Sequence, residues 1–174
     1  STKNIIYKGM LSSLQLRGYF PDLTNPYFTS GIALVHSRFS TNTFPTWGLA
    51  QPFRLLAHNG EINTIGGNAK WVKARESAMA SPLFGEDLRR VFPVVEADGS
   101  DSAMLDEYLA FLLHAGYSLP QACMTAIPQA YENDPQMDPA LRDFYAYTDC
   151  LSEPWDGPAA VAFTDGRLAG AMLD

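Results

Sequence analysis

The stretch that decides the fold of this chain reads AAVAFTDGRLAGAM, residues 159–172. Two runs suited to extended backbone, 159–164 and 167–172, flank the dipeptide Asp165-Gly166. A two-residue Asp-Gly link favours the tight turn of an antiparallel hairpin, because both positions accept a positive φ. The sequence therefore predicts a β-hairpin over this stretch.

Further strands are expected earlier in the chain. Residues 31–39 alternate and carry β-forming side chains, and residues 53–57 form a second extended run. Asn59-Gly60 follows that run, so the same turn argument predicts another hairpin, with residues 61–64 as its returning strand.

The middle of the chain is expected to be helical. A helix capped by Asn68 should run through Ala80, and Ser118 and Asp138 are suited to cap two later helices. The best helix has apolar residues at the spacing of one face: Met104, Leu105, Tyr108, Leu109, Leu112 and Leu113. Strands on both sides of a helical middle favour an α+β fold of layered antiparallel sheets with helices.

Composition excludes several classes of function. A chain of 174 residues has the usual length of a single domain, so residues 1–174 are expected to form one. The net charge of −7 argues against a nucleic-acid partner. The uncharged stretch 108–131 is broken by polar residues and prolines, so it predicts two helices with a turn at Gly116 and no membrane partner. Two cysteines, Cys123 and Cys150, make neither a disulfide framework nor a metal cluster, and a reducing compartment is expected.

Arg38 is the first candidate site residue. It leaves an expected strand among hydroxyl and amide side chains, Thr41 and Asn42 included. Its planar guanidinium can grip a carboxylate through two parallel hydrogen bonds. The alternative is a surface arginine followed by a polar turn.

Asn59-Gly60 and Asp101 are the second and third candidates. An Asn side chain beside a Gly backbone N–H can form an oxyanion hole, although the pair also suits a plain turn. Asp101, at the start of the best helix, can receive a substrate ammonium or simply cap the helix. The helix N-terminus should help to keep this carboxylate ionised. Taken together, the three candidates suit an α-amino acid with a side-chain carbonyl, and glutamine fits.

The chain resembles the class II glutamine amidotransferase domain of the amino-terminal-nucleophile hydrolases, and within that class the glutamate synthases. The resemblance covers essentially the whole chain. Its clearest stretches are YKGM (7–10), RFSTNTFPTW (38–47), HNGEINT (58–64), GSDS (99–102) and EPWDGPA (153–159).

The resemblance implies a role for each candidate. Arg38 would bind the α-carboxylate of glutamine, with Thr41 and Asn42 shaping that pocket. Asn59 and Gly60 would form the oxyanion hole, and Asp101 would bind the α-ammonium. The fold implied is of the αββα type, with the 174 residues as its central and C-terminal part.

The chain departs from the family pattern at the nucleophile. Members attack glutamine with an amino-terminal cysteine whose own α-amine serves as base, whereas this sequence begins with Ser1. Cys123 suits a core position and Cys150 has no basic partner nearby in sequence, so neither is expected to attack. We expect the nucleophile to lie in a preceding segment and these residues alone to be inactive.

Further expectations concern the rest of a longer protein. The resemblance implies synthase domains that use the ammonia to aminate 2-oxoglutarate, with flavin mononucleotide (FMN) and an iron–sulfur cluster bound outside this segment. The implied location is the cytoplasm, or the plastid stroma in a plant or alga. Two alternatives remain open: a catalytically dead amino-acid-binding or docking domain of the same fold, and another class II amidotransferase.

Overall fold

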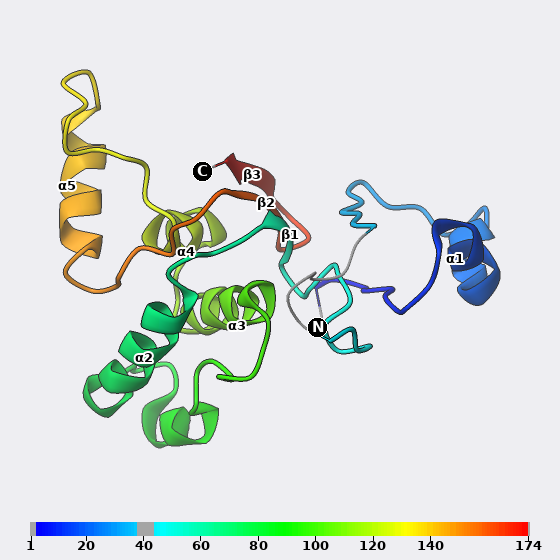
Figure 1. Cartoon of the computed structure of the whole chain (residues 1–174), viewed down its shortest axis with the longest axis horizontal. Helices are drawn as coiled ribbons and strands as arrows, with labels where there is room; N and C mark the ends of the chain where they lie inside the picture. The colour runs from blue at the N-terminus through cyan, green and yellow to red at the C-terminus, as the bar shows by residue number, and fades with distance from the viewer. Residues whose placement is uncertain (1–2, 38–43, 174) are drawn as a thin grey trace.

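The structure is a computed structural model that describes residues 3–37 and 44–173 (Figure 1). Helices α2 to α5 and the sheet gather together, whereas α1 lies apart from them and buries none of its residues. The helices are α1 (Ser13–Tyr19), α2 (Ile65–Arg75), α3 (Asp101–His114), α4 (Leu119–Ala126) and α5 (Pro139–Thr148). Short 3-10 helices occupy η1 (Pro21–Thr24), η2 (Glu76–Ala78) and η3 (Gly85–Val91).

The described residues form one antiparallel sheet in the order β1-β2-β3, from β1 (Leu56–Gly60), β2 (Ala159–Thr164) and β3 (Ala169–Leu173). The hairpin predicted over residues 159–172 is confirmed as β2 and β3. Gly166 takes φ +85° in the turn, and the Asp165 carboxylate accepts the N–H groups of Arg167 and Leu168, both at 2.9 Å. Helices together with an antiparallel sheet confirm the α+β class.

The two faces of the sheet differ in composition. Side chains alternate along each strand, so Leu56 and His58 share a face with Val161 and Phe163. That face looks toward α3 and forms part of the core. The opposite face carries mostly alanines and stays partly open, ending at Leu173, which is 84% exposed.

The predicted helices α3, α4 and α5 are confirmed, as are the predicted caps Ser118 and Asp138. Ser100 Oγ accepts the Ala103 N–H at 3.2 Å, Ser118 and Gln121 form a capping box, and Asp138 accepts the Ala140 N–H at 2.8 Å. Such caps satisfy backbone donors that have no partner inside the helix. In the core, the ring of Trp155 stacks on the ring of Tyr108 of α3, with the ring centroids 5.2 Å apart.

The hairpin predicted at Asn59-Gly60 is wrong. Both residues belong to β1, which pairs with β2, and residues 61–64 lead directly into α2. The physical reason is a long-range one. Gly60 pairs with Ala159 at the start of β2, and a Cβ at Gly60 would lie 2.0 Å from the carbonyl oxygen of the preceding residue, Pro158.

The strand predicted over residues 31–39 is also not formed, as far as the described part, 31–37, shows. An extended segment becomes a strand only when another strand pairs with it, and Val35 there is 77% exposed. The Asn68 cap is wrong as well, since α2 begins at Ile65. Asn68 is buried inside that helix and donates to the Pro154 carbonyl at 2.9 Å.

Within the described residues, no helix has the length and apolar character needed to cross a membrane.

Candidate functional site

The end of β1 presents the two predicted oxyanion donors, Asn59 and Gly60. Thr164 N–H donates to Leu55 O at 2.8 Å and Glu61 N–H to Pro158 O at 3.3 Å. In an antiparallel ladder, alternate residues bond to the neighbouring strand. The Gly60 N–H therefore points away from β2, toward the open edge of the sheet, where it can meet a substrate oxygen.

The side chain of Asn59 lies on the sheet face opposite His58 and is exposed. An amide at an exposed strand end, followed by an edge-facing N–H, supplies two donors that an oxyanion could accept. Their use in this way stays a prediction.

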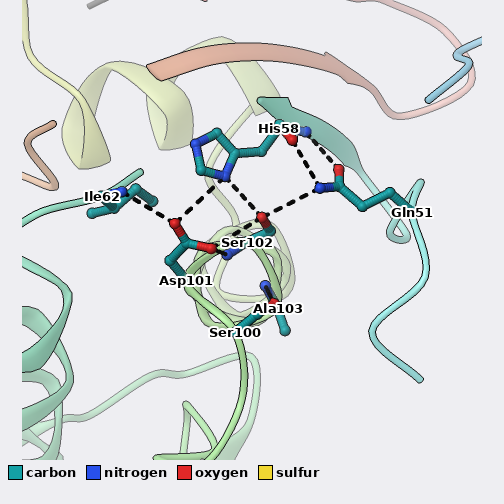
Figure 2. Close-up of polar contacts among 7 residues, drawn as sticks. All are labelled: Gln51, His58, Ile62, Ser100, Asp101, Ser102 and Ala103. Atoms are coloured by element: carbon teal, nitrogen blue, oxygen red, sulfur yellow. Dashed lines mark hydrogen bonds and ion pairs between the residues drawn. The ribbon is translucent and has the colours of Figure 1, made fainter. Parts of the chain in front are cut away.

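Asp101 is the first residue of α3, and the structure places it directly beside this strand end (Figure 2). Its Oδ2 accepts the Ile62 N–H at 3.1 Å, and its Oδ1 accepts the Ser102 N–H at 2.7 Å. Ser100, rather than Asp101, is the helix cap. The Asp101 side chain keeps 18% exposure, so solvent or a ligand can still reach the carboxylate.

His58 is a site residue to which the sequence analysis assigned no role. It is 2% exposed and faces the start of α3, where Nδ1 lies 2.8 Å from Ser102 Oγ and 3.9 Å from Asp101 Oδ2. Nε2 is buried and has no hydrogen-bond partner among the described residues. In the sequence, the only sign that His58 belongs to the site was its position next to Asn59.

Gln51 holds the backbone of His58 at the open edge of β1 (Figure 2). The Gln51 amide donates to His58 O at 2.8 Å and accepts the His58 N–H at 2.7 Å. At His58, the Gln51 side chain therefore makes the two backbone hydrogen bonds that a neighbouring strand would make. Nothing in the local sequence indicates it, because the contact depends on how residues 50–55 return to β1.

Burial lowers the pKa of His58 below its ordinary value of 6.5, against the opposing attraction of the Asp101 carboxylate. The positive charge of His36 would lower this pKa further, so the chain comes near β1 two residues before Arg38. Arg38, Thr41 and Asn42 themselves lie outside the described residues. The structure therefore places Asp101 beside the segment that follows Asn59 and Gly60, while the Asn59 side chain lies on the opposite face of the sheet.

Neither cysteine belongs to this group of residues. Cys123 is 1% exposed in α4, and burial raises the pKa of its thiol to about 12. Cys150 lies beyond α5 with its thiol 3.5 Å from the Ala146 carbonyl. The described residues also contain no cluster of three or more His, Cys, Asp or Glu side chains that could hold a metal ion.

A hollow of about 1270 Å³ opens beside α2, between η2 and η3. Glu76 lines it but is already engaged, accepting the Val94 N–H at 2.9 Å and the Lys73 ammonium at 2.6 Å. Asn59, Gly60 and Asp101 are absent from its described lining. These three residues lie elsewhere, at the junction of β1 and α3.

Comparison with known proteins gives a consistent result. The family model of class II glutamine amidotransferases matches residues 1–174. A glutamate synthase (NADH) of Saccharomyces cerevisiae is 54% identical over 171 residues, which cover 98% of this chain and 8% of that protein. The glutamate synthase (NADPH) large chain of Bacillus subtilis is 49% identical over 174 residues, covering 100% and 11%.

A ferredoxin-dependent glutamate synthase of Antithamnion sp. is 48% identical over 176 residues, covering 100% of this chain and 12% of that protein. This chain thus spans about a tenth of the length of the relatives it matches.

Proposed function

The chain belongs to the class II glutamine amidotransferases, and from that premise we propose that residues 1–174 are the glutamine-binding and oxyanion-hole part of a glutaminase domain. The parent protein is proposed to be a glutamate synthase, the name that its relatives carry. In this proposal the 174 residues form the central and C-terminal part of a single domain.

One observation carries the proposal: the hydrogen bond of 3.1 Å from the Ile62 N–H to Asp101 Oδ2. It places a carboxylate next to the strand end that presents Asn59 and the Gly60 N–H. The α-ammonium of glutamine would meet the Asp101 carboxylate. Its side-chain carbonyl would meet the donors of Asn59 and Gly60. An anionic acceptor and neutral donors on adjoining elements suit these two groups.

The proposed reaction is acyl transfer to a thiol. A cysteine thiolate adds to the side-chain carbonyl of glutamine, and Asn59 and Gly60 donate hydrogen bonds to the oxyanion that forms. The C–N bond then breaks, the leaving nitrogen takes a proton as ammonia, and water hydrolyses the thioester to release glutamate. Arg38 would hold the α-carboxylate, with Thr41 and Asn42 beside it, and Asp101 would hold the α-ammonium.

The attacking cysteine is proposed to be neither of the two in this chain. The buried, high-pKa thiol of Cys123 disfavours thiolate formation, and the Cys150 thiol lies against the Ala146 carbonyl of α5. We therefore expect the 174 residues alone not to hydrolyse glutamine.

The ammonia would aminate 2-oxoglutarate in other domains of the parent, using FMN and an iron–sulfur cluster. These residues do not fit such a cluster, which is held by four thiolates in its common forms, because one of their two cysteines is in the core and the other is exposed. The cluster is therefore assigned to other parts of the protein, and FMN is proposed to bind there as well.

The test is glutaminase kinetics of the full-length protein that carries this segment. Asn59→Ala should lower kcat by about 10²–10³-fold with little change in KM. Asp101→Asn keeps an acceptor for the Ile62 N–H but loses the charge, so KM for glutamine should rise more than about tenfold. Asn133→Ala, in an exposed loop, is the matched control and should change neither.

Unchanged kinetics in Asn59→Ala and Asp101→Asn would overturn these roles. A full-length protein that binds glutamine without hydrolysing it would instead be the catalytically dead binding domain. Ammonia release at enzymatic rates by the 174-residue chain itself would contradict the assignment of the nucleophile.

A further inference from the structure

The ring of His58 connects the two halves of the proposed site. His58 immediately precedes Asn59 on β1, and Ser102 immediately follows Asp101 on α3. The contact between His58 Nδ1 and Ser102 Oγ, at 2.8 Å, therefore joins β1, which carries Asn59 and Gly60, to the residue that follows Asp101 (Figure 2).

This contact is held firmly on both sides. Gln51 fixes the backbone of His58 through two hydrogen bonds, of 2.7 and 2.8 Å. Ser102 is 3% exposed and lies in the first turn of α3, where Ser100 caps the helix. Buried side chains held in this way have little freedom to change rotamer, so the ring acts as a spacer of defined length.

The protons can be placed from the hydrogen bonds. Burial lowers the pKa of His58, so the neutral ring carries one proton. A Ser102 hydroxyl proton directed at Asp101 Oδ1, 3.3 Å away, leaves Ser102 Oγ to accept a proton from Nδ1. In the reverse arrangement Nδ1 would accept the Ser102 hydroxyl proton, which would take that donor from Asp101 Oδ1 and leave an unprotonated Nδ1 3.9 Å from Asp101 Oδ2.

The first arrangement forms a chain from His58 Nδ1–H through the Ser102 hydroxyl to the Asp101 carboxylate. It adds a hydrogen bond to Asp101 Oδ1 beyond that from the Ser102 N–H. It also makes Nε2 the unprotonated nitrogen, and this atom has no partner among the described residues.

We propose that His58 is a positioning residue: through Ser102 it holds the Asp101 carboxylate in place relative to Asn59 and Gly60, and so determines how strongly the site favours a substrate with an α-ammonium. The inference rests on the proposed function, in which Asp101 receives that ammonium. His58 does not itself touch the substrate.

The experiment compares glutamine with 4-carbamoylbutanoate, which is glutamine without its α-amine, in the full-length protein. His58→Leu removes the Nδ1 donor, and the ratio of kcat/KM for glutamine over the analogue should fall about tenfold. His58→Asn can keep a donor near the Nδ1 position and should retain most of the preference. His114→Leu, at the exposed end of α3, is the control and should keep all of it.

A general structural role would not give this pattern. Equal losses with both substrates in His58→Leu, or an unchanged ratio, would overturn the proposal. Ser102→Ala breaks the same chain with a smaller change of volume, so it should also lower the ratio. It serves as the test if His58→Leu fails to fold.

Binding separates this inference from the proposed function. Calorimetry of the full-length protein with glutamine and with 4-carbamoylbutanoate gives a ratio of dissociation constants without any turnover. A protein that binds glutamine preferentially but releases no ammonia contradicts the glutaminase, while the loss of preference in Ser102→Ala still supports His58. A wild-type protein that shows no preference for the amine overturns the inference.

Discussion

Ile62 and Asp101 are joined by a hydrogen bond of 3.1 Å between a backbone N–H and a carboxylate oxygen. The bond connects the segment that leaves β1 to the first residue of α3. Because α3 is anchored in the core through Leu105 and Leu109, which are 0% and 1% exposed, the carboxylate has a rigid support. The geometry of the candidate site therefore depends on the packing of a helix against the end of a strand.

Gly60→Ala should unfold the site. An added Cβ would lie 2.0 Å from the Pro158 carbonyl oxygen, and φ is +120°, so we expect a loss of at least about 3 kcal/mol of unfolding free energy. Gly66→Ala in α2 is the control: nothing lies within 4 Å of its added Cβ. It should be neutral or stabilise the helix by up to about 1 kcal/mol. Urea denaturation measures both variants, and equal stabilities would refute the close approach of β2.

Acid should destabilise the chain through His58. Its pKa in the folded state is below the ordinary 6.5, so between these two values the unfolded chain binds more protons than the folded one. The unfolding free energy should therefore fall as the pH drops below about 6.5. Thermal denaturation between pH 7.5 and pH 5 should show this slope in the wild type and a shallower one in His58→Asn.

Asp106→Ala should destabilise the fold more than a surface aspartate does. Asp106 is 1% exposed and accepts the Leu55 N–H at 2.8 Å and Arg54 Nε at 2.9 Å. Its removal leaves a buried N–H without a partner, which costs about 2–3 kcal/mol. Asp87→Ala breaks only the exposed pair with Arg90 and should change stability by less than about 0.5 kcal/mol. Chemical denaturation compares the two, and a similar effect would contradict this difference.

The two cysteines should differ in reactivity. Burial raises the pKa of Cys123 to about 12 and shields it, whereas Cys150 is exposed. Under native conditions iodoacetamide should label Cys150 at least about a hundredfold faster, and in urea the two should react alike. Peptide mapping by mass spectrometry measures the labelling. Fast native labelling of Cys123 would show that α4 opens readily.

Local patterns predicted the helices well. The capping residues Ser118 and Asp138 and the apolar face of α3 act within a few residues of one another, so they are visible in the sequence. Of the two hairpins predicted from adjacent strands, the one formed by β2 and β3 is confirmed and the one at Asn59-Gly60 is wrong. The expected strand over residues 31–39 depended on a distant partner that the described residues do not supply.

The candidate site was predicted in part. Asn59, Gly60 and Asp101 were chosen as chemical types in a plausible order, and the structure brings their segments together. Gln51 and the His58–Ser102 contact were not predicted, because each joins residues whose proximity exists only in the fold.

By itself, the sequence determined the α+β class, helices α3 to α5 with the caps of α4 and α5, the hairpin of β2 and β3 and the residue types of the site, because these follow from periodicity and from contacts between near neighbours. The tertiary structure alone decided that Asn59-Gly60 belongs to a strand paired with β2 and not to a turn. The dipeptides Asp165-Gly166 and Asn59-Gly60 carry the same local signal. What separates them is the pairing partner: Asn59 and Gly60 pair with Ala160 and Ala159 of β2, far along the chain, whereas the segments that flank Asp165-Gly166 pair with each other.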